Sequence, residues 1–109
     1  EIIKQVQLEA KGFDKIMVFL DSNHTHSHVL DELRAYAPLV SSNSYCVVFD
    51  SVIEDLPDTL HGDRPWKKGD NPKTALHEYL LEDESFSIDE TIDERLLISV
   101  APNGYLKRR

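Results

Sequence analysis

Two short stretches of the same pattern, Val18-Phe19-Leu20-Asp21 and Val47-Val48-Phe49-Asp50, decide the fold of this chain. Each is an apolar run that ends in an aspartate. Such runs are typical of strands that are buried on both faces, as the strands of parallel sheets are. The two runs and the segment between them occupy about 35 residues, the size of a strand–helix–strand unit. The pattern therefore predicts two parallel strands joined by a crossover helix.

The remaining elements follow from apolar spacing and from the residues that start and stop helices. We predict a helix over about residues 2–11, a crossover helix that ends at Pro38, and a third helix that starts at Asn71-Pro72. Two further strands are predicted at residues 86–88 and 96–100. Because the link between them is short, we expect them to pair as an antiparallel hairpin.

A long segment without a regular pattern, residues 54–71, lies between the second strand and the third helix. It contains two prolines, two glycines and several charges. Long loops in compact domains are often functional, so we interpret this one as a lid. Trp66 lies within it, and either packs over a site or anchors the loop.

Composition limits the kinds of partner. The 109 residues are enough for one domain at most, and the net charge of -8 argues against a nucleic-acid partner. No apolar stretch is long enough to span a bilayer. The single cysteine, Cys46, lies in an apolar run and is expected to be a buried thiol, which fits a cytoplasmic location.

The two aspartates predict a metal site. In open α/β sheets, ligands bind beyond the carboxyl ends of the strands, and neighbouring strands lie about 4.8 Å apart. Asp21 and Asp50 would then emerge side by side, where a divalent cation such as Mg²⁺ neutralises their repulsion. The alternative is that each aspartate caps the helix or turn that follows it.

Three alternate residues, His24, His26 and His28, follow the first aspartate. His24 lies three residues past Asp21, so it could face the same cleft as a general base or a metal neighbour. A zinc site built on the three histidines is a second hypothesis. The third is that they are polar residues at a helix start.

Several motifs resemble one known family, that of cephalosporin hydroxylases and rhamnosyl O-methyltransferases. These motifs are Asp21–Leu30, Tyr36–Val40, Ser44–Asp50, Asp63–Trp66 and Gly104–Arg108. The similarity covers nearly all 109 residues in order, and it corresponds to the C-terminal portion of the family.

The resemblance implies a fold and a set of site residues. The fold would be the C-terminal half of a Rossmann-like methyltransferase sheet, with the strands of this chain as the fourth to seventh. Asp21 and Asp50 match the acids that hold Mg²⁺ in the family. Ser51 stands where the more distant catechol O-methyltransferases have an asparagine ligand, so we include Ser51 as a third ligand. His24 stands where those enzymes use a lysine base, which makes it the candidate catalytic residue.

The resemblance also implies a cofactor, S-adenosylmethionine, whose binding elements this chain lacks. In the family, a glycine-rich loop after the first strand and an acid after the second hold that cofactor. Because the chain starts at Glu1 within a predicted helix, we expect it to be cut from something longer. Residues 1–109 are therefore interpreted as a single partial domain.

Two functions remain open. The first is the metal- and acceptor-binding part of an O-methyltransferase that acts on a sugar-like or other polar hydroxyl of a small molecule, inactive alone. The alternative is a non-catalytic remnant that self-associates. The strand at residues 16–20 has an unpaired edge, and such edges invite pairing, so we expect a homo-oligomer that buries Val18 and Phe19.

Overall fold

Four short strands form one mixed sheet in the order β1-β2-β4-β3, and a computed structural model describes it together with the helices over residues 2–109. The strands are β1 (Val18–Leu20), β2 (Tyr45–Val48), β3 (Phe86–Ile88) and β4 (Tyr105–Arg108). The α-helices are α1 (Ile2–Ala10), α2 (His26–Tyr36), α3 (Pro72–Glu82) and α4 (Glu90–Leu96). Three 3₁₀ turns are η1 (Ala37–Leu39), η2 (Ser51–Asp55) and η3 (Asp58–Leu60).

The predicted parallel pair with its crossover helix is confirmed. β1 pairs with β2 in parallel, with Leu20 opposite Val48, and α2 lies between them in the chain. β4 pairs antiparallel with both β2 and β3. The α/β fold class is therefore as predicted, and the C-terminal part of the sheet is antiparallel, with β3 and β4 as its strands.

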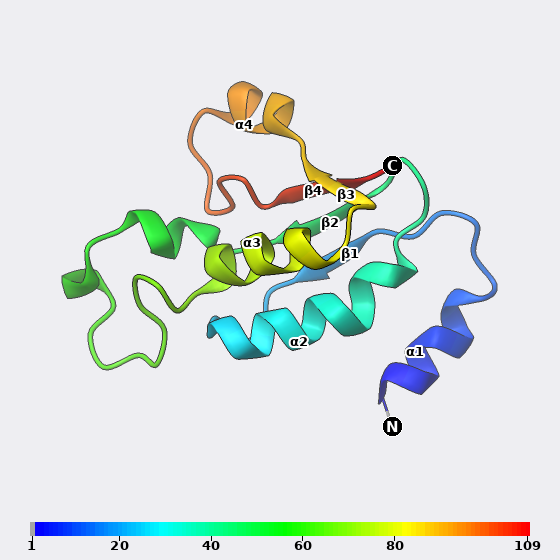
Figure 1. The fold of residues 1–109 in the computed structure, drawn as a ribbon, viewed down its shortest axis with the longest axis horizontal. Helices are drawn as coiled ribbons and strands as arrows, with labels where there is room; N and C mark the ends of the chain where they lie inside the picture. Colours follow the sequence, from blue (N-terminus) through cyan, green and yellow to red (C-terminus); the bar gives the residue numbers. More distant parts are fainter. Residues whose placement is uncertain (1) are drawn as a thin grey trace.

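The core lies between one face of the sheet and two helices. Figure 1 shows α2 and α3 side by side, and both contribute fully buried leucines, Leu33 and Leu76. The strands meet them with Leu20, Cys46, Val48, Phe86 and Leu106. Because side chains alternate along a strand, Phe19 points to the opposite face, where it is 59% exposed.

The start of α3 was predicted from Asn71-Pro72 and is confirmed in detail. Asn71 accepts hydrogen bonds from the backbone N–H groups of Lys73 and Thr74, and the Thr74 side chain bonds back to the Asn71 backbone. This reciprocal arrangement is a capping box. It fixes where the preceding loop must end.

The prediction of a strand at residues 96–100 is wrong. Leu96 is the last residue of α4, whose N-terminus is capped by Asp89, and Leu97 after it has a positive φ of 63°. Leu97 and Ile98 are 85% and 92% exposed, so the continuous apolar run does not mark a buried strand. The strand that completes the sheet is instead β4, whose half-polar sequence buries only Leu106.

The N-terminal helix is confirmed over Ile2–Ala10, but it adds little to the core. None of its described residues is buried, and Figure 1 shows α1 apart from the α2–α3 layer. Between α1, β1 and α2 lies a mostly apolar cavity of about 400 Å³, lined among others by Val6, Phe19 and Tyr36. β1 is the outermost strand of the sheet, and its second edge pairs with no other strand among residues 2–109.

Candidate functional site

Two aspartates lie at the same rim of the sheet, as the sequence predicted. Asp21 and Asp50 follow the carboxyl ends of β1 and β2, which are held in register there by the Phe49 N–H donating to the Leu20 carbonyl (3.1 Å). Asp50 has a left-handed backbone (φ 60°), a conformation that aspartate tolerates better than most residues. The alternation of side chains that begins in β2 ends at this turn.

His24 completes a three-residue cluster with the two aspartates. One ligand atom from each of Asp21, His24 and Asp50 lies within 4.8 Å of the others. The His24 Nε2 is 3.3 Å from Asp50 Oδ2. Asp21 is exposed, whereas His24 and Asp50 are half-buried, so the cluster opens to solvent on the β1 side.

The electrostatics of Asp50 reflect this crowding. Partial burial raises the pKa of the Asp50 carboxyl above its usual value, and the adjacent Asp21 acts in the same direction. His24 opposes both because an imidazolium favours the ionised carboxylate. A divalent cation among these groups would relieve the crowding. The donor set of carboxylates and imidazole therefore fits a divalent metal.

Ser51 was predicted as a third ligand, and its hydroxyl is engaged elsewhere. Ser51 is fully buried at the start of η2, and its Oγ donates to the Pro102 carbonyl at 2.7 Å. This bond ties η2 to the segment before β4. A metal role for Ser51 stays a prediction, and the structure gives the side chain a packing role.

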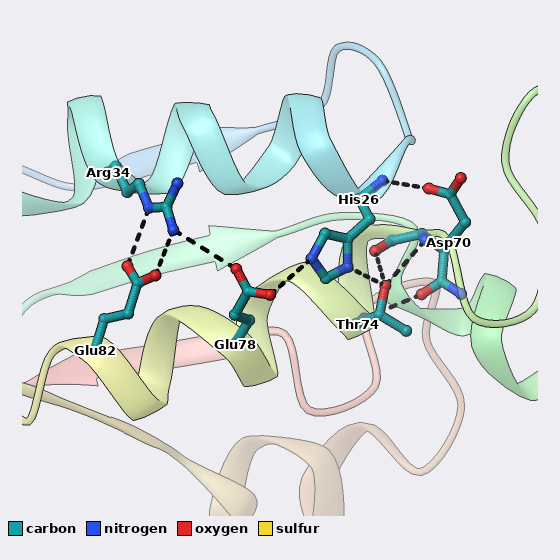
Figure 2. Close-up of polar contacts among 7 residues, drawn as sticks. His26, Arg34, Asp70, Thr74, Glu78 and Glu82 are labelled. Carbon is teal, nitrogen blue, oxygen red and sulfur yellow. Dashed lines mark hydrogen bonds and ion pairs between the residues drawn. The ribbon is translucent and has the colours of Figure 1, made fainter.

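The three histidines diverge, so they form no common zinc site. His26 Nε2 faces Glu78 Oε1 at 3.4 Å, and its Nδ1 lies 2.7 Å from Thr74 Oγ1 (Figure 2). His28 Nε2 lies 3.1 Å from Ser22 Oγ, on the solvent side. Only His24 of the three joins the aspartate cluster.

The cluster around His28 also includes an acid but has no catalytic geometry. Glu32 accepts a hydrogen bond from Ser22 Oγ (2.9 Å), and its other oxygen lies 3.6 Å from His28 Nε2. The serine and the acid thus meet the same imidazole nitrogen. A relay needs them on opposite nitrogens, so this group is a surface network.

Figure 2 also shows a polar seam between α2 and α3. Arg34 donates to Glu82 with two nitrogens and lies 3.6 Å from Glu78. Near the other end of α2, Asp70 Oδ1 accepts from the His26 backbone N–H at 2.7 Å. The loop before α3 therefore caps the first turn of α2, next to the aspartate cluster.

The loop predicted as a lid reaches the cluster through Trp66. Its ring is edge-on to His24, with centroids 4.6 Å apart and planes at 84°. Of the two roles left open for this tryptophan, contact with the site is the one that the structure shows. The sequence offered no signal for this pairing, because the two residues are far apart in the chain.

Glu54 fixes the base of the same loop. Its Oε1 accepts from the Gly69 backbone N–H (2.7 Å) and from Asn71 Nδ2 (2.9 Å). The Gly69 bond lowers the pKa of the Glu54 carboxyl below its usual value, and Asn71 adds to this effect. Sequence analysis missed Glu54 because a single acid in a polar loop carries no pattern.

The described residues do not form a cradle for S-adenosylmethionine. Of the glycines, Gly62 and Gly69 lie in the loop, and Gly12 follows α1. Gly104 is packed so closely that an added Cβ would lie 2.3 Å from the Val48 carbonyl oxygen. Within residues 2–109, no glycine-rich turn follows a parallel strand. The glycine-rich loop that the resemblance implies for that cofactor is therefore not found among the described residues.

Comparisons with known proteins place the chain in one family. The family described as rhamnosyl O-methyltransferase/CmcI matches residues 1–109. Relatives named rhamnosyl O-methyltransferase from Mycobacterium tuberculosis and Mycobacterium bovis are 36% identical over 111 residues, which is 99% of this chain and 41% of theirs. One from Mycobacterium leprae is 29% identical over 110 residues, with 44% of its length covered.

The chain spans only about two fifths of the length of these relatives. No solved structure matches the chain at a comparable level. None of the helices described in residues 2–109 is both long and apolar enough to cross a membrane. Because the family match extends over residues 1–109, this chain belongs to the rhamnosyl O-methyltransferase/CmcI family.

Proposed function

We propose that this chain is the metal- and acceptor-binding part of an S-adenosylmethionine-dependent O-methyltransferase. The observation that carries the proposal is the convergence of Asp21, His24 and Asp50 at one rim of the sheet. The names of its relatives suggest a sugar hydroxyl, such as that of a rhamnosyl group, as the acceptor. We propose a cytoplasmic location because the only cysteine, Cys46, is a buried free thiol.

Asp21 and Asp50 would hold the metal, with Mg²⁺ as the proposed ion. Both offer hard carboxylate oxygens, and the exposed side of the cluster leaves room for an acceptor oxygen. When bound, a divalent cation would lower the pKa of the acceptor hydroxyl and fix its position. Ser51 could help only through a lone pair, because its proton is donated to Pro102.

His24 is the proposed general base. Its Nε2 faces the carboxylates at 3.3 Å from Asp50, so a proton taken from the acceptor hydroxyl would form an imidazolium beside negative charge. That charge stabilises the protonated form. The segment around Trp66 would cover the acceptor and limit the access of water, as a lid does.

We do not assign the binding of S-adenosylmethionine to the described residues of this chain. Because no cradle for S-adenosylmethionine is formed by residues 2–109, we propose that this chain is inactive alone. The relatives are more than twice as long as the matched region, which leaves room for that function in them.

Isothermal titration tests the division of roles. We expect Mg²⁺ to bind the 109-residue chain, with loss of binding in Asp21→Asn and no change in the surface control Asp31→Asn. S-adenosylmethionine should give no heat. Tight cofactor binding to this chain, or Mg²⁺ binding that survives Asp21→Asn, would contradict the proposal.

A second candidate is self-association without catalysis. The open edge of β1 and the 59% exposure of Phe19 favour it, because unpaired strand edges beside apolar surface invite pairing. The expected product is a homo-oligomer that buries Val18 and Phe19. A monomer in light scattering at micromolar concentration would count against this candidate.

A further inference from the structure

Trp66, the single tryptophan of the chain, contacts the one histidine that joins the aspartate cluster. The two rings meet edge to face, with centroids 4.6 Å apart. Edge-to-face packing is a preferred arrangement of aromatic pairs. The contact joins the loop after β2 to the segment after β1.

Trp66 is itself held in place from two directions. Arg64 lies over its ring, with Cζ 5.6 Å from the centroid. Directly after it, Lys67 and Asp70 exchange two backbone hydrogen bonds of 2.9 Å, and Asn71 Nδ2 donates to the Lys67 carbonyl. Because Asn71 also caps α3, the position of Trp66 is set by the start of that helix.

His24 has contacts on two sides. Nε2 lies 3.3 Å from Asp50, the indole lies against the ring, and the side chain is 19% exposed. The carboxylate contact restrains only one atom of the ring, so a change of rotamer would break a single contact. The indole adds a second restraint, since a rotated imidazole would collide with it or lose this contact as well.

We propose that Trp66 is a positioning residue that holds the imidazole of His24 in the one orientation that directs Nε2 at the aspartate cluster. The role of His24 as a base rests on the proposed function. The packing role of Trp66 does not, and the two are tested separately.

The first test is the side-chain conformation of His24 in solution, without metal. NMR on protein with isotope-labelled histidine gives the Hα–Hβ couplings, which distinguish one χ1 rotamer from an average of several. We expect a single rotamer in the parent protein and in Trp66→Phe, and averaged couplings in Trp66→Leu. Leu60→Ala, in the same loop but 65% exposed, is the matched control.

The couplings of His26 and the thermal unfolding midpoint show whether the variants remain folded. If Trp66→Leu does not fold, Arg64→Ala gives the milder version of the same test, with partial averaging at His24. A single His24 rotamer retained in folded Trp66→Leu, or in Arg64→Ala when that variant has to be used, overturns the proposal.

The second test uses Mn²⁺, a divalent ion that carboxylates bind and that is read directly by electron paramagnetic resonance of the free ion. Residues that orient a site typically change metal affinity tenfold or more, so Trp66→Leu should weaken Mn²⁺ binding by about tenfold. Trp66→Phe should restore most of it. Unchanged affinity in Trp66→Leu counts against positioning at the metal site. Absence of Mn²⁺ binding to the parent protein would contradict the proposed function. The Hα–Hβ couplings of His24 would still decide the role of Trp66.

Discussion

The two faces of the sheet differ in how far the chain itself covers them. On the α2–α3 side, Leu33, Leu76 and Leu106 are fully buried and form one continuous core. On the other side Val47 in β2 is still buried, but toward the β1 edge Phe19 is 59% exposed and stacks on Phe49, with ring centroids 6.0 Å apart. The closed face explains how this segment can fold, whereas the open face shows where it still has apolar surface to bury.

The aspartate cluster lies where these two regions meet. Asp50 follows β2, an interior strand, and is half-buried, whereas Asp21 follows the edge strand and is exposed. One ligand is therefore built on the closed core, and the other on the strand with the open edge. Four substitutions test this difference between the two regions.

The largest effect is expected in the closed core. Leu76→Ala removes a fully buried side chain that lies between α3 and the strands, so the free energy of unfolding should fall by about 3 kcal/mol. Urea denaturation followed by circular dichroism measures it. A loss below about 1 kcal/mol would mean that the α2–α3 face is not the main source of stability.

At the junction, Asp50→Asn separates metal binding from folding. Mg²⁺ affinity should fall by about a hundredfold because one of two carboxylate ligands is lost. His28→Gln, outside the cluster, is the control in the same titration.

The stability of the metal-free Asp50→Asn variant should move the other way. The folded-state pKa of Asp50 is raised, so its ionised form costs stability at neutral pH, and that cost is absent below the unfolded pKa. Asparagine tolerates the left-handed backbone, so the variant should be at least as stable as the parent at pH 7. The difference should vanish at low pH, and a variant that is clearly less stable at pH 7 would contradict this reading of the pKa.

A smaller effect is expected at the base of the loop. Glu54→Gln weakens the bonds to Gly69 and Asn71, and should cost about 1 kcal/mol at neutral pH for a partly exposed group. Because the folded-state pKa of Glu54 is lowered, its contribution is present above the unfolded pKa and is lost as pH falls through the folded pKa. The two proteins should therefore converge in acid unfolding curves, and a constant difference across pH would exclude this cause.

The smallest effect on unfolding is expected on the open face. Phe19→Ser replaces an apolar side chain that is mostly exposed, so monomer stability should change by less than about 1 kcal/mol. If the chain self-associates through β1, the same substitution should instead weaken the oligomer in light scattering. A loss of several kcal/mol in a monomer would show that this face is covered in solution.

Much of the fold and part of the site were predictable because they depend on local patterns. The parallel pair followed from two apolar runs, and the start of α3 followed from Asn71-Pro72. The strand at residues 96–100 was mispredicted because an apolar run looks alike whether it is buried or exposed. The true strand, β4, has a half-polar sequence that only its pairing with β2 and β3 explains.

The sequence by itself determined that two aspartates would end neighbouring parallel strands, since strand direction and the crossover helix leave few other arrangements. Only the tertiary structure decided that His24 joins them while His26 and His28 turn away, and that Trp66 closes on His24. The physical reason is the distance along the chain between the residues that meet. Periodicity fixes which face a residue lies on, but contacts between distant loops depend on how helices pack and where their caps hold the chain.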